Sequence, residues 1–461
     1  MKILRIGTKE SKEKIEKILN RKTLLEDKRL EQKVKEIIED VRRNGDQALL
    51  KYTRKFDRVL LTSKRLRVSR REIEEAQKLV DKEFVKALKK AYQNIKKYHE
   101  KQLPRSFKIY PRKGVNLEER FQPLERVGLY IPGGRASYPS TVLMAGVPAK
   151  IAGVREIIMV SPPQRDGKLS PYILVAAGLV GISEIYKAGG AQAIAALAYG
   201  TEIIPKVDKI VGPGNIYVTL AKKLVYGEVD IDMLAGPSEI LILADESANP
   251  SFIACDLIAQ AEHDRLSWPI LVTTSLKLAQ KVEEEIKEQV KSLRRKEIID
   301  TSLKNNGVLI VTKNLKETID LANEIAPEHL EIMTRNPEQV AKKIKNAGAI
   351  FLGPYSAESV GDYIAGPNHI LPTSGTARFY SPLGVRDFMK SSHIISYSKE
   401  ALKKEAKEII ELAHREGLDG HARAVKIRLQ PQRTPNYRKK RKKPLRTSRT
   451  FSGLSGCKEG D

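Results

Sequence analysis

Apolar and polar residues alternate in two different ways along this chain. Up to about residue 100, apolar positions recur every three to four residues, which is the spacing of amphipathic helices. The stretch EQKVKEIIEDVRRNGDQALLKYTRKFD shows this spacing, and its NGD tripeptide is a break within it. The pattern therefore predicts a mainly helical N-terminal region.

From about residue 126 the pattern changes to short runs rich in Val and Ile that alternate with helical segments. The runs are RVGLYI, EIIMVS, KIVGPG, EILILAD, PILVTT, GVLIVT and AIFLG. Continuous apolar runs of this length, separated by helices, are typical of buried strands in parallel sheets. We therefore predict an α/β fold. After about residue 384 the helical spacing returns, and beyond Arg428 no periodicity remains.

The chain of 461 residues is long enough for two or more domains. Its formal net charge is +26, and residues 431–461 alone hold 10 Lys or Arg against 2 Asp or Glu. Elsewhere basic residues alternate with acidic ones, as in KVEEEIKEQVKSLRRKEI, which is typical of a solvated helix surface. We therefore expect the basic tail to contact nucleic acid only nonspecifically.

A nucleic-acid-binding protein on an enzyme-like scaffold is the competing hypothesis from a different class. It requires aromatic residues that stack on bases, but aromatics make up 6% of the chain and the tail has only Tyr437 and Phe451.

No apolar run approaches the roughly 20 residues that span a bilayer, and the N-terminus lacks a signal-peptide pattern. We expect a cytoplasmic protein without membrane contact.

Four of the seven histidines stand beside carboxylates, amides or glycines. One is in AQAEHD, which ends an apolar run; on a helix, Asp256, Gln260 and His263 would lie in one stripe. Such a stripe suits a metal ion, but a histidine at a helix end is also commonly a capping or core residue. The pattern alone leaves both interpretations open.

Two further stretches present acid–histidine pairs. Asp362 and His369 occur in the Gly- and Pro-containing loop SVGDYIAGPNHILPTSG, where they suit either metal ligation or an Asx turn. Glu328 and His329 are adjacent in APEHLEI; the histidine suits proton transfer near neutral pH, and the carboxylate suits activation of water. A helix start at Pro327 would explain Glu328 but not His329.

The sequence contains neither G-x-G-x-x-G after a predicted strand nor G-x-x-x-x-G-K-[ST]. Three glycine-rich turns do follow predicted strands: YIPGGRASYPST, AGGAQAI and VGPGNIYV. Glycine at such turns lets the backbone approach a ligand closely, and helix N-termini favour phosphate. Residue types and spacing thus indicate an α/β enzyme with room for a metal and a nucleotide.

Taken in order, these motifs resemble the histidinol dehydrogenase family. The resemblance rests on RVGLYIPGG, AGGAQAIAALAYGT, GPGNIYV, DMLAGPSEILILAD, AQAEHD, APEHLEI, GDYIAGPNHILPTSGTARF and EGLDGHARAV, and it covers about residues 20–428. It implies oxidation of L-histidinol to L-histidine through L-histidinaldehyde in two successive NAD-dependent steps, the last of histidine biosynthesis.

The resemblance also implies cofactors and roles for individual residues. The cofactors are one Zn²⁺ per subunit, which orients the substrate, and NAD. His329 would be the general base, and Glu328 would activate water. The implied zinc ligands are Gln260, His263, Asp362 and His421. The implied NAD contacts are Tyr130, Gln192 and Asn215. The implied substrate contacts are Ser238, Gln260, His263, His329, Asp362, His369, Glu416 and His421.

The fold implied by the resemblance has two incomplete Rossmann-like domains with parallel sheets and small helical extensions at both termini. The implied division is an N-terminal extension at 1–25, a large metal-binding and catalytic domain at 26–129 and 238–383, an NAD-binding domain at 130–237, a C-terminal extension at 384–428, and an unstructured basic tail at 429–461. The family is a homodimer in which the C-terminal extension reaches the partner's active site. Glu416 and His421 would then serve the neighbouring subunit.

The cysteines bear on the mechanism of aldehyde oxidation. Cys255 and Cys457 are too few for a disulfide framework or a Cys-rich zinc motif. Cys255 would lie about 140° around the helix from Gln260, so hydration by activated water fits better than a thiohemiacetal. A zinc-dependent hydrolase is the third hypothesis, but it needs no NAD and leaves the three glycine turns unexplained.

Overall fold

The structure is a computed structural model that describes residues 1–21, 26–133 and 137–430. The chain divides into two compact units. Of the described residues, the first unit comprises those in Met1–Ser106 and Glu119–Ser392, and the second comprises Phe107–Glu118 and residues 393–430. Within the described residues, no helix combines the length and apolar character needed to span a membrane.

The first unit contains a six-stranded sheet in which every pairing is parallel. Its strands, in spatial order, are β1 (Lys2–Arg5), β11 (Val308–Val311), β10 (Trp268–Thr273), β9 (Glu239–Ala244), β12 (His329–Met333) and β13 (Ala349–Leu352). From β9 the chain adds β10 and β11 on one side and then returns to add β12 and β13 on the other. The strand order therefore reverses between β9 and β12, as in Rossmann-type sheets.

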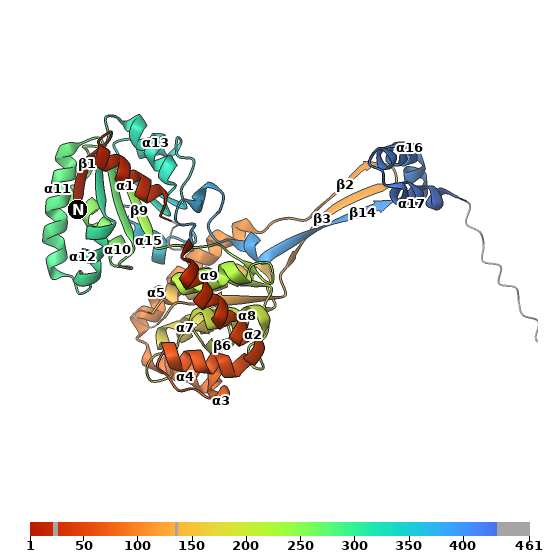
Figure 1. The fold of residues 1–461 in the computed structure, drawn as a ribbon, viewed down its shortest axis with the longest axis horizontal. Helices are drawn as coiled ribbons and strands as arrows, with labels where there is room; N and C mark the ends of the chain where they lie inside the picture. Colours follow the sequence, from red (N-terminus) through yellow and green to blue (C-terminus); the bar gives the residue numbers. More distant parts are fainter. Residues whose placement is uncertain (22–25, 134–136, 431–461) are drawn as a thin grey trace, which may run out of the picture. The chain divides into compact units, whose positions relative to one another are not determined.

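Helices cover both faces of this sheet (Figure 1). On one face, buried residues of alternate strand positions pack with α10 (Pro250–Ala261), α11 (Leu276–Gln289) and α12 (Lys296–Asn305). On the other face they pack with α1 (Lys9–Leu19), α13 (Leu315–Ile325) and α14 (Pro337–Ala341). Burial on both faces explains why these strands are apolar throughout and could be recognised from the sequence.

A second, five-stranded sheet in the same unit is also parallel in every pairing. In spatial order it contains β6 (Glu184–Lys187), β5 (Glu156–Ser161), β4 (Arg126–Tyr130), β7 (Lys209–Val211) and β8 (Asp230–Ile231). Its order reverses between β4 and β7. One face is covered by α2 (Lys28–Phe56), α8 (Gly190–Tyr199) and α9 (Ile216–Val225). The other is covered by α4 (Arg70–Leu79), α5 (Lys82–His99), α6 (Pro139–Ala152) and α7 (Pro171–Val180).

The expected α/β class with parallel sheets is confirmed, but the expected domain boundaries differ in two places. Residues 26–129 were expected with the catalytic sheet, whereas α2, α4, α5 and β4 pack in the cores of the five-stranded sheet. Residues 1–25 were expected as a helical extension, whereas β1 pairs with β11 and α1 covers the six-stranded sheet. Amphipathic periodicity fixes which face of a helix is buried, but it does not say which sheet that face meets.

Smaller elements complete the first unit and shape its loops. Among the described residues they include α3 (Ser63–Leu66), α15 (Glu358–Tyr363), and 3₁₀ turns at Glu100–Gln102, Val290–Ser292, Thr376–Arg378 and Val385–Phe388. Helix α2 is interrupted at Gly45, whose φ of 47° lies in the left-handed region. This is the break that the NGD tripeptide predicted, because glycine adopts such angles without a Cβ clash.

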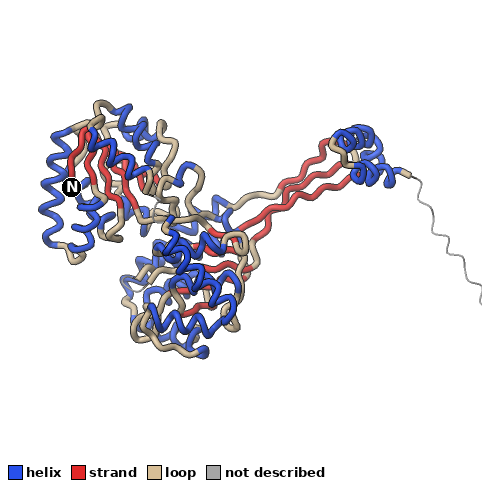
Figure 2. Tube along the Cα trace, in the orientation of Figure 1, coloured by secondary structure: helices blue, strands red, loops and turns tan. Residues whose placement is uncertain are grey.

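The second unit contains part of a three-stranded sheet, shown with the other strands in Figure 2. The strand order is β14 (Met389–Tyr397), β3 (Val115–Pro123) and β2 (Phe107–Arg112), and α16 (Lys399–Arg415) packs on α17 (Asp419–Leu429). The prediction of helix from residue 384 missed β14. Seven of its nine residues are exposed, so the strand has no apolar run. Residues 431–461, most of the predicted basic tail, lie outside the described residues.

Candidate active site

Most of the site residues expected from the sequence gather at the amino edge of the six-stranded sheet. Glu239 is the first residue of β9, and His329 is the first residue of the neighbouring strand β12. Helix α10 follows β9 and packs on the sheet, so its C-terminal end returns to the same edge with Gln260. The helix start considered for APEHLEI is wrong: α13 ends before it, and the histidine opens a buried strand.

His329 is held as a neutral base. Its Nδ1 lies 3.1 Å from the backbone oxygen of Glu239. Because a carbonyl oxygen can only accept, Nδ1 carries the ring proton and Nε2 keeps its lone pair. Nε2 is buried and has no hydrogen-bond partner among the described residues. Burial, partly offset by the charge of Asp362, lowers the pKa of His329 to about 4, so the ring is uncharged at neutral pH.

Glu328 lies beside this histidine and is equally buried. Its Oε2 accepts a hydrogen bond of 2.9 Å from the backbone N–H of Glu239 and lies 3.7 Å from His329 Nδ1. Burial raises the pKa of Glu328 well above its usual value, because the charged form loses its water shell. One acid and one base with strongly shifted pKa values therefore share a buried strand end, an arrangement found in catalytic sites.

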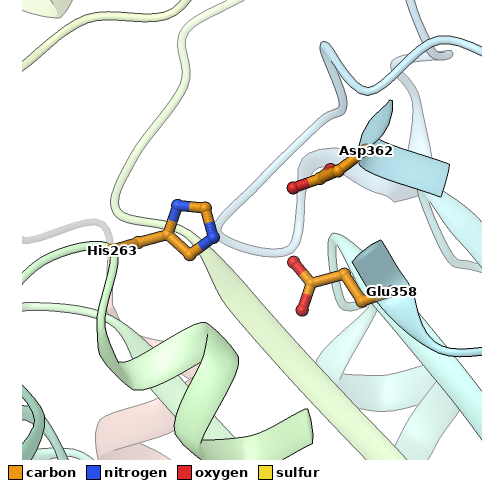
Figure 3. A group of neighbouring side chains, drawn as sticks. All are labelled: His263, Glu358 and Asp362. Carbon is orange, nitrogen blue, oxygen red and sulfur yellow. The ribbon is translucent and has the colours of Figure 1, made fainter. Parts of the chain in front are cut away.

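A group of potential metal ligands lies next to this pair. One ligand atom each of His263, Glu358 and Asp362 lies within 4.8 Å of the others, and Figure 3 shows the three side chains pointing toward one another. His263 follows the end of α10, and the two carboxylates are one turn apart on α15. Imidazole nitrogen together with carboxylate oxygen is a donor set that suits zinc.

The structure places the other residues of the predicted helix stripe differently. With its NH₂ facing Glu358, the buried amide of Gln260 donates to both carboxylate oxygens at 2.6 and 2.8 Å and accepts from the Glu239 N–H at 3.2 Å. Gln260 therefore contacts the potential metal ligands through Glu358. Asp256 hydrogen-bonds Glu331 on β12, whose Oε1 in turn accepts from the Glu358 N–H at 2.9 Å.

The loop that contains His369 bonds to the residue that supplies the Asp362 carboxylate. His369 Nδ1 lies 3.0 Å from the backbone oxygen of Asp362, and its Nε2 lies 3.3 Å from Thr141 Oγ1 on α6. Burial lowers the pKa of His369, despite the opposing charge of Asp362. Ser238 is half-buried and directly precedes Glu239 at the start of β9. His369 thus lies beside Asp362, and Ser238 adjoins Glu239 in the chain; their contacts with a substrate stay predictions.

The expected nucleotide contacts lie at the carboxyl edge of the other sheet. Tyr130 ends β4, and Asn215 caps α9 directly after β7, so the two flank the reversal in strand order. Nucleotides bind Rossmann-type sheets at this point. The Tyr130 hydroxyl accepts from the Gly190 N–H at 3.1 Å. Gln192 is buried, and neither polar atom of its amide has a hydrogen-bond partner among the described residues. An unpaired buried amide is costly unless a ligand satisfies it.

Two expected site residues belong to the second unit. Glu416 is the C-cap of α16, and His421 lies in the first turns of α17; both side chains are exposed. Their part in a metal and substrate site stays a prediction.

Sequence reasoning missed two carboxylates that the structure brings into the site. Glu239 opens the apolar run EILILA, and Glu358 opens α15; each is buried. A charged residue that opens an otherwise apolar strand was a usable signal for Glu239, because charges are rarely buried without a partner. No such local signal marks Glu358.

Two parallel sheets with reversed strand order, a buried acid–base pair and adjacent metal-type ligands define an α/β enzyme. The histidinol dehydrogenase family model matches residues 20–429. The chain is 55% identical to the histidinol dehydrogenase of Caldanaerobacter subterraneus over 412 residues, which cover 89% of this chain and 95% of that one. It is 56% identical to that of Clostridium acetobutylicum over 395 residues, covering 86% and 91%.

A solved structure is also similar. The crystal structure of histidinol dehydrogenase from Elizabethkingia anophelis matches with a TM-score of 0.82 and 43% identity, covering 87% of this chain and 92% of that one. The chain belongs to the histidinol dehydrogenase family and is an oxidoreductase.

Proposed function

We propose that this protein oxidises L-histidinol to L-histidine through L-histidinaldehyde, in two NAD-dependent steps that complete histidine biosynthesis in the cytoplasm. The observation that carries the proposal is the buried Nε2 of His329, which has no hydrogen-bond partner among the described residues. The same ring lies next to the candidate metal group, with Nδ1 3.5 Å from Glu358 Oε1. A neutral imidazole whose other nitrogen is held by a backbone carbonyl is suited to accept a proton from a substrate hydroxyl.

In the first step, His329 Nε2 takes the hydroxyl proton of the substrate as a hydride leaves the carbinol carbon. When bound, NAD would supply the acceptor for the hydride of each step. In the second step, the carboxylate form of Glu328 removes a proton from water as the water oxygen bonds to the aldehyde carbon, and His329 returns the proton taken in the first step to the aldehyde oxygen, which gives the hydrate. His329 then takes a hydroxyl proton from the hydrate as the second hydride leaves. The raised pKa of Glu328 supports this role, because a carboxylate with a higher pKa is a stronger base.

The residues present fit one Zn²⁺. His263 and Asp362 supply an imidazole and a carboxylate within the same small group, and both are only partly buried, which leaves access for a substrate. We propose Gln260 and the partner subunit's His421 as the remaining ligands; Gln260 would exchange its contact with Glu358 for the metal. When bound, zinc would orient the substrate in front of His329.

The other expected contacts complete the proposal. Ser238, His369 and Glu416 would contact the substrate, the last from the partner chain of a homodimer. Tyr130, Gln192 and Asn215 would contact NAD. The place of Tyr130 and Asn215 at the reversal in strand order supports this, as does the Gln192 amide, which has no partner among the described residues. A cysteine intermediate is not required, because Cys255 lies on the exposed side of α10.

A spectrophotometric assay with L-histidinol and NAD tests the function. We expect two NADH for each L-histidinol consumed, with activity lost on treatment with a strong chelator and regained with Zn²⁺. One NADH per substrate would contradict the second step. Full turnover by protein shown to be metal-free would contradict the role of zinc.

A further inference from the structure

The chain contains an ion pair in the first unit, buried beneath the proposed active site, to which the proposed chemistry assigns no role. Arg21 follows α1, and its guanidinium forms a two-point contact with the carboxylate of Glu239, with Nη2 to Oε1 at 3.0 Å. Both side chains are only 1% exposed. A buried pair of this kind stabilises a protein little compared with apolar residues of the same volume, so its presence calls for another explanation.

Glu239 holds both members of the proposed catalytic pair through its backbone. Its N–H donates to Glu328 Oε2 at 2.9 Å, and its carbonyl accepts from His329 Nδ1 at 3.1 Å. The second bond determines which ring nitrogen of His329 is free to act as a base. A shift of the Glu239 backbone would therefore displace the acid and the base together.

Arg21 also bonds to the end of α13, the segment that precedes Glu328 and His329 in the chain. Its Nη2 donates to the carbonyl of Ile325 at 2.9 Å, and its Nη1 donates to the carbonyl of Ile18 at 2.7 Å. Ile325 ends α13, and the next residue, Ala326, has a left-handed φ of 49° that few non-glycine residues adopt. One guanidinium thus connects the ends of two helices to the first residue of β9.

We propose that Arg21 and Glu239 are positioning residues, which fix the strand end that sets the geometry of Glu328 and His329. Neither residue contacts substrate in this proposal; Arg21 acts through Glu239 and Ile325. The inference rests on the proposed roles of Glu328 and His329.

The test compares Arg21→Met with the double variant Arg21→Met/Glu239→Gln. The single variant leaves a buried carboxylate without its cation, so we expect a lower Tm and a lower kcat. The double variant removes both charges, and its amide oxygen can still accept the Ser374 N–H, which lies 2.5 Å from Glu239 Oε1. We expect the double variant to regain most of its Tm, while kcat stays about 100-fold below the parent enzyme, since displacement by about 1 Å costs that much.

Two further measurements separate positioning from stability. The KM for NAD, whose proposed contacts lie at the other sheet, should match the parent enzyme. As a matched control, Lys187→Met removes the buried cation of the Lys187–Glu72 pair in the other sheet, and it should lower Tm without changing kcat. Recovery of kcat together with Tm in the double variant would overturn the inference.

Arg21→Lys covers the case in which the methionine variants do not fold. Lysine keeps the positive charge but cannot reproduce the planar fork that serves Glu239 and two carbonyls at once. We expect a folded protein with kcat lowered on the order of 10-fold or more; an unchanged kcat would refute the inference. If the parent enzyme itself makes no NADH from L-histidinol, the proposed function fails instead, so the two failures are distinct.

Discussion

At the scale of single residues, burial is what gives the candidate site its chemistry. Glu328 and His329 are ordinary residue types, and adjacent acid and histidine residues occur in many proteins. Loss of water raises the pKa of Glu328 and lowers that of His329, so both side chains favour their uncharged forms. An uncharged imidazole is ready to accept a proton from a substrate near neutral pH, and a carboxyl group with a raised pKa is a stronger base once it has lost its own proton.

The shifted pKa of Glu328 predicts a pH-dependent effect on stability. Below its usual value of 4.5, the carboxyl is protonated in both the folded and the unfolded chain and contributes no pH dependence. Above 4.5 the unfolded chain loses the proton while the folded chain keeps it, so wild-type stability falls as pH rises toward the folded pKa. The free energy of unfolding should fall by about 1.4 kcal/mol for each pKa unit of the shift.

Glu328→Gln removes this loss, because the amide carries no charge and can still accept the Glu239 N–H. The metal-free variant should therefore unfold at a higher denaturant concentration than the metal-free wild type at pH 8, with the difference vanishing near pH 4. A variant that is equally stabilised at both pH values would show that the effect does not come from ionisation of this residue.

At the scale of elements, the site depends on where strands and helices end. Asn215 is a clear case, because its side-chain oxygen accepts from the N–H groups of Tyr217 and Val218 and so caps α9. The same residue is a proposed NAD contact. Its amide NH₂ is therefore the part available to a ligand, while its oxygen holds the helix.

Two substitutions separate these roles of Asn215. Asn215→Asp keeps the capping oxygen but loses the NH₂ donor, so we expect an unchanged Tm and a KM for NAD raised about 10-fold, equivalent to about 1.4 kcal/mol. Asn215→Ala loses both, and the free energy of unfolding should fall by about 1 kcal/mol as well. Both variants should raise the KM for NAD, but only Asn215→Ala should lower Tm. Two variants with the same Tm and the same KM would contradict the separation of the two roles.

At the scale of the whole molecule, the proposed site residues belong to two compact units. Gln260, His263 and Asp362 belong to the first unit, whereas Glu416 and His421 belong to the second. The exposure of His421 fits a residue that acts on another chain, as in the proposed homodimer.

Mixed dimers test this division. Neither His263→Ala nor His421→Ala should be active by itself. When the two chains are mixed and allowed to exchange, one site of each mixed dimer would contain both defects and the other none. For random association we expect about a quarter of wild-type activity, because half of the dimers are mixed and each has one intact site. Mixtures as inactive as the parent variants would contradict a site shared between subunits.

The strands were predictable where both of their faces are buried. EIIMVS and EILILAD are apolar throughout, because helices cover each sheet on both sides, and the structure confirms them as β5 and β9. β14 was missed because most of its side chains are exposed. β12 was missed because polar residues, His329 and Glu331, interrupt its apolar run; they are buried there only because neighbouring groups bond them.

The sequence by itself determined the α/β class, most buried strands and the acid–histidine pairs, since these follow from periodicity and residue type over short distances. Only the tertiary structure decided which sheet each N-terminal helix covers, that Glu358 joins His263 and Asp362, and that Arg21 and Glu239 pair beneath His329. Those contacts join residues far apart in the chain. Local patterns do not determine them, because burial, charge pairing and the direction of a side chain depend on what the rest of the fold places opposite.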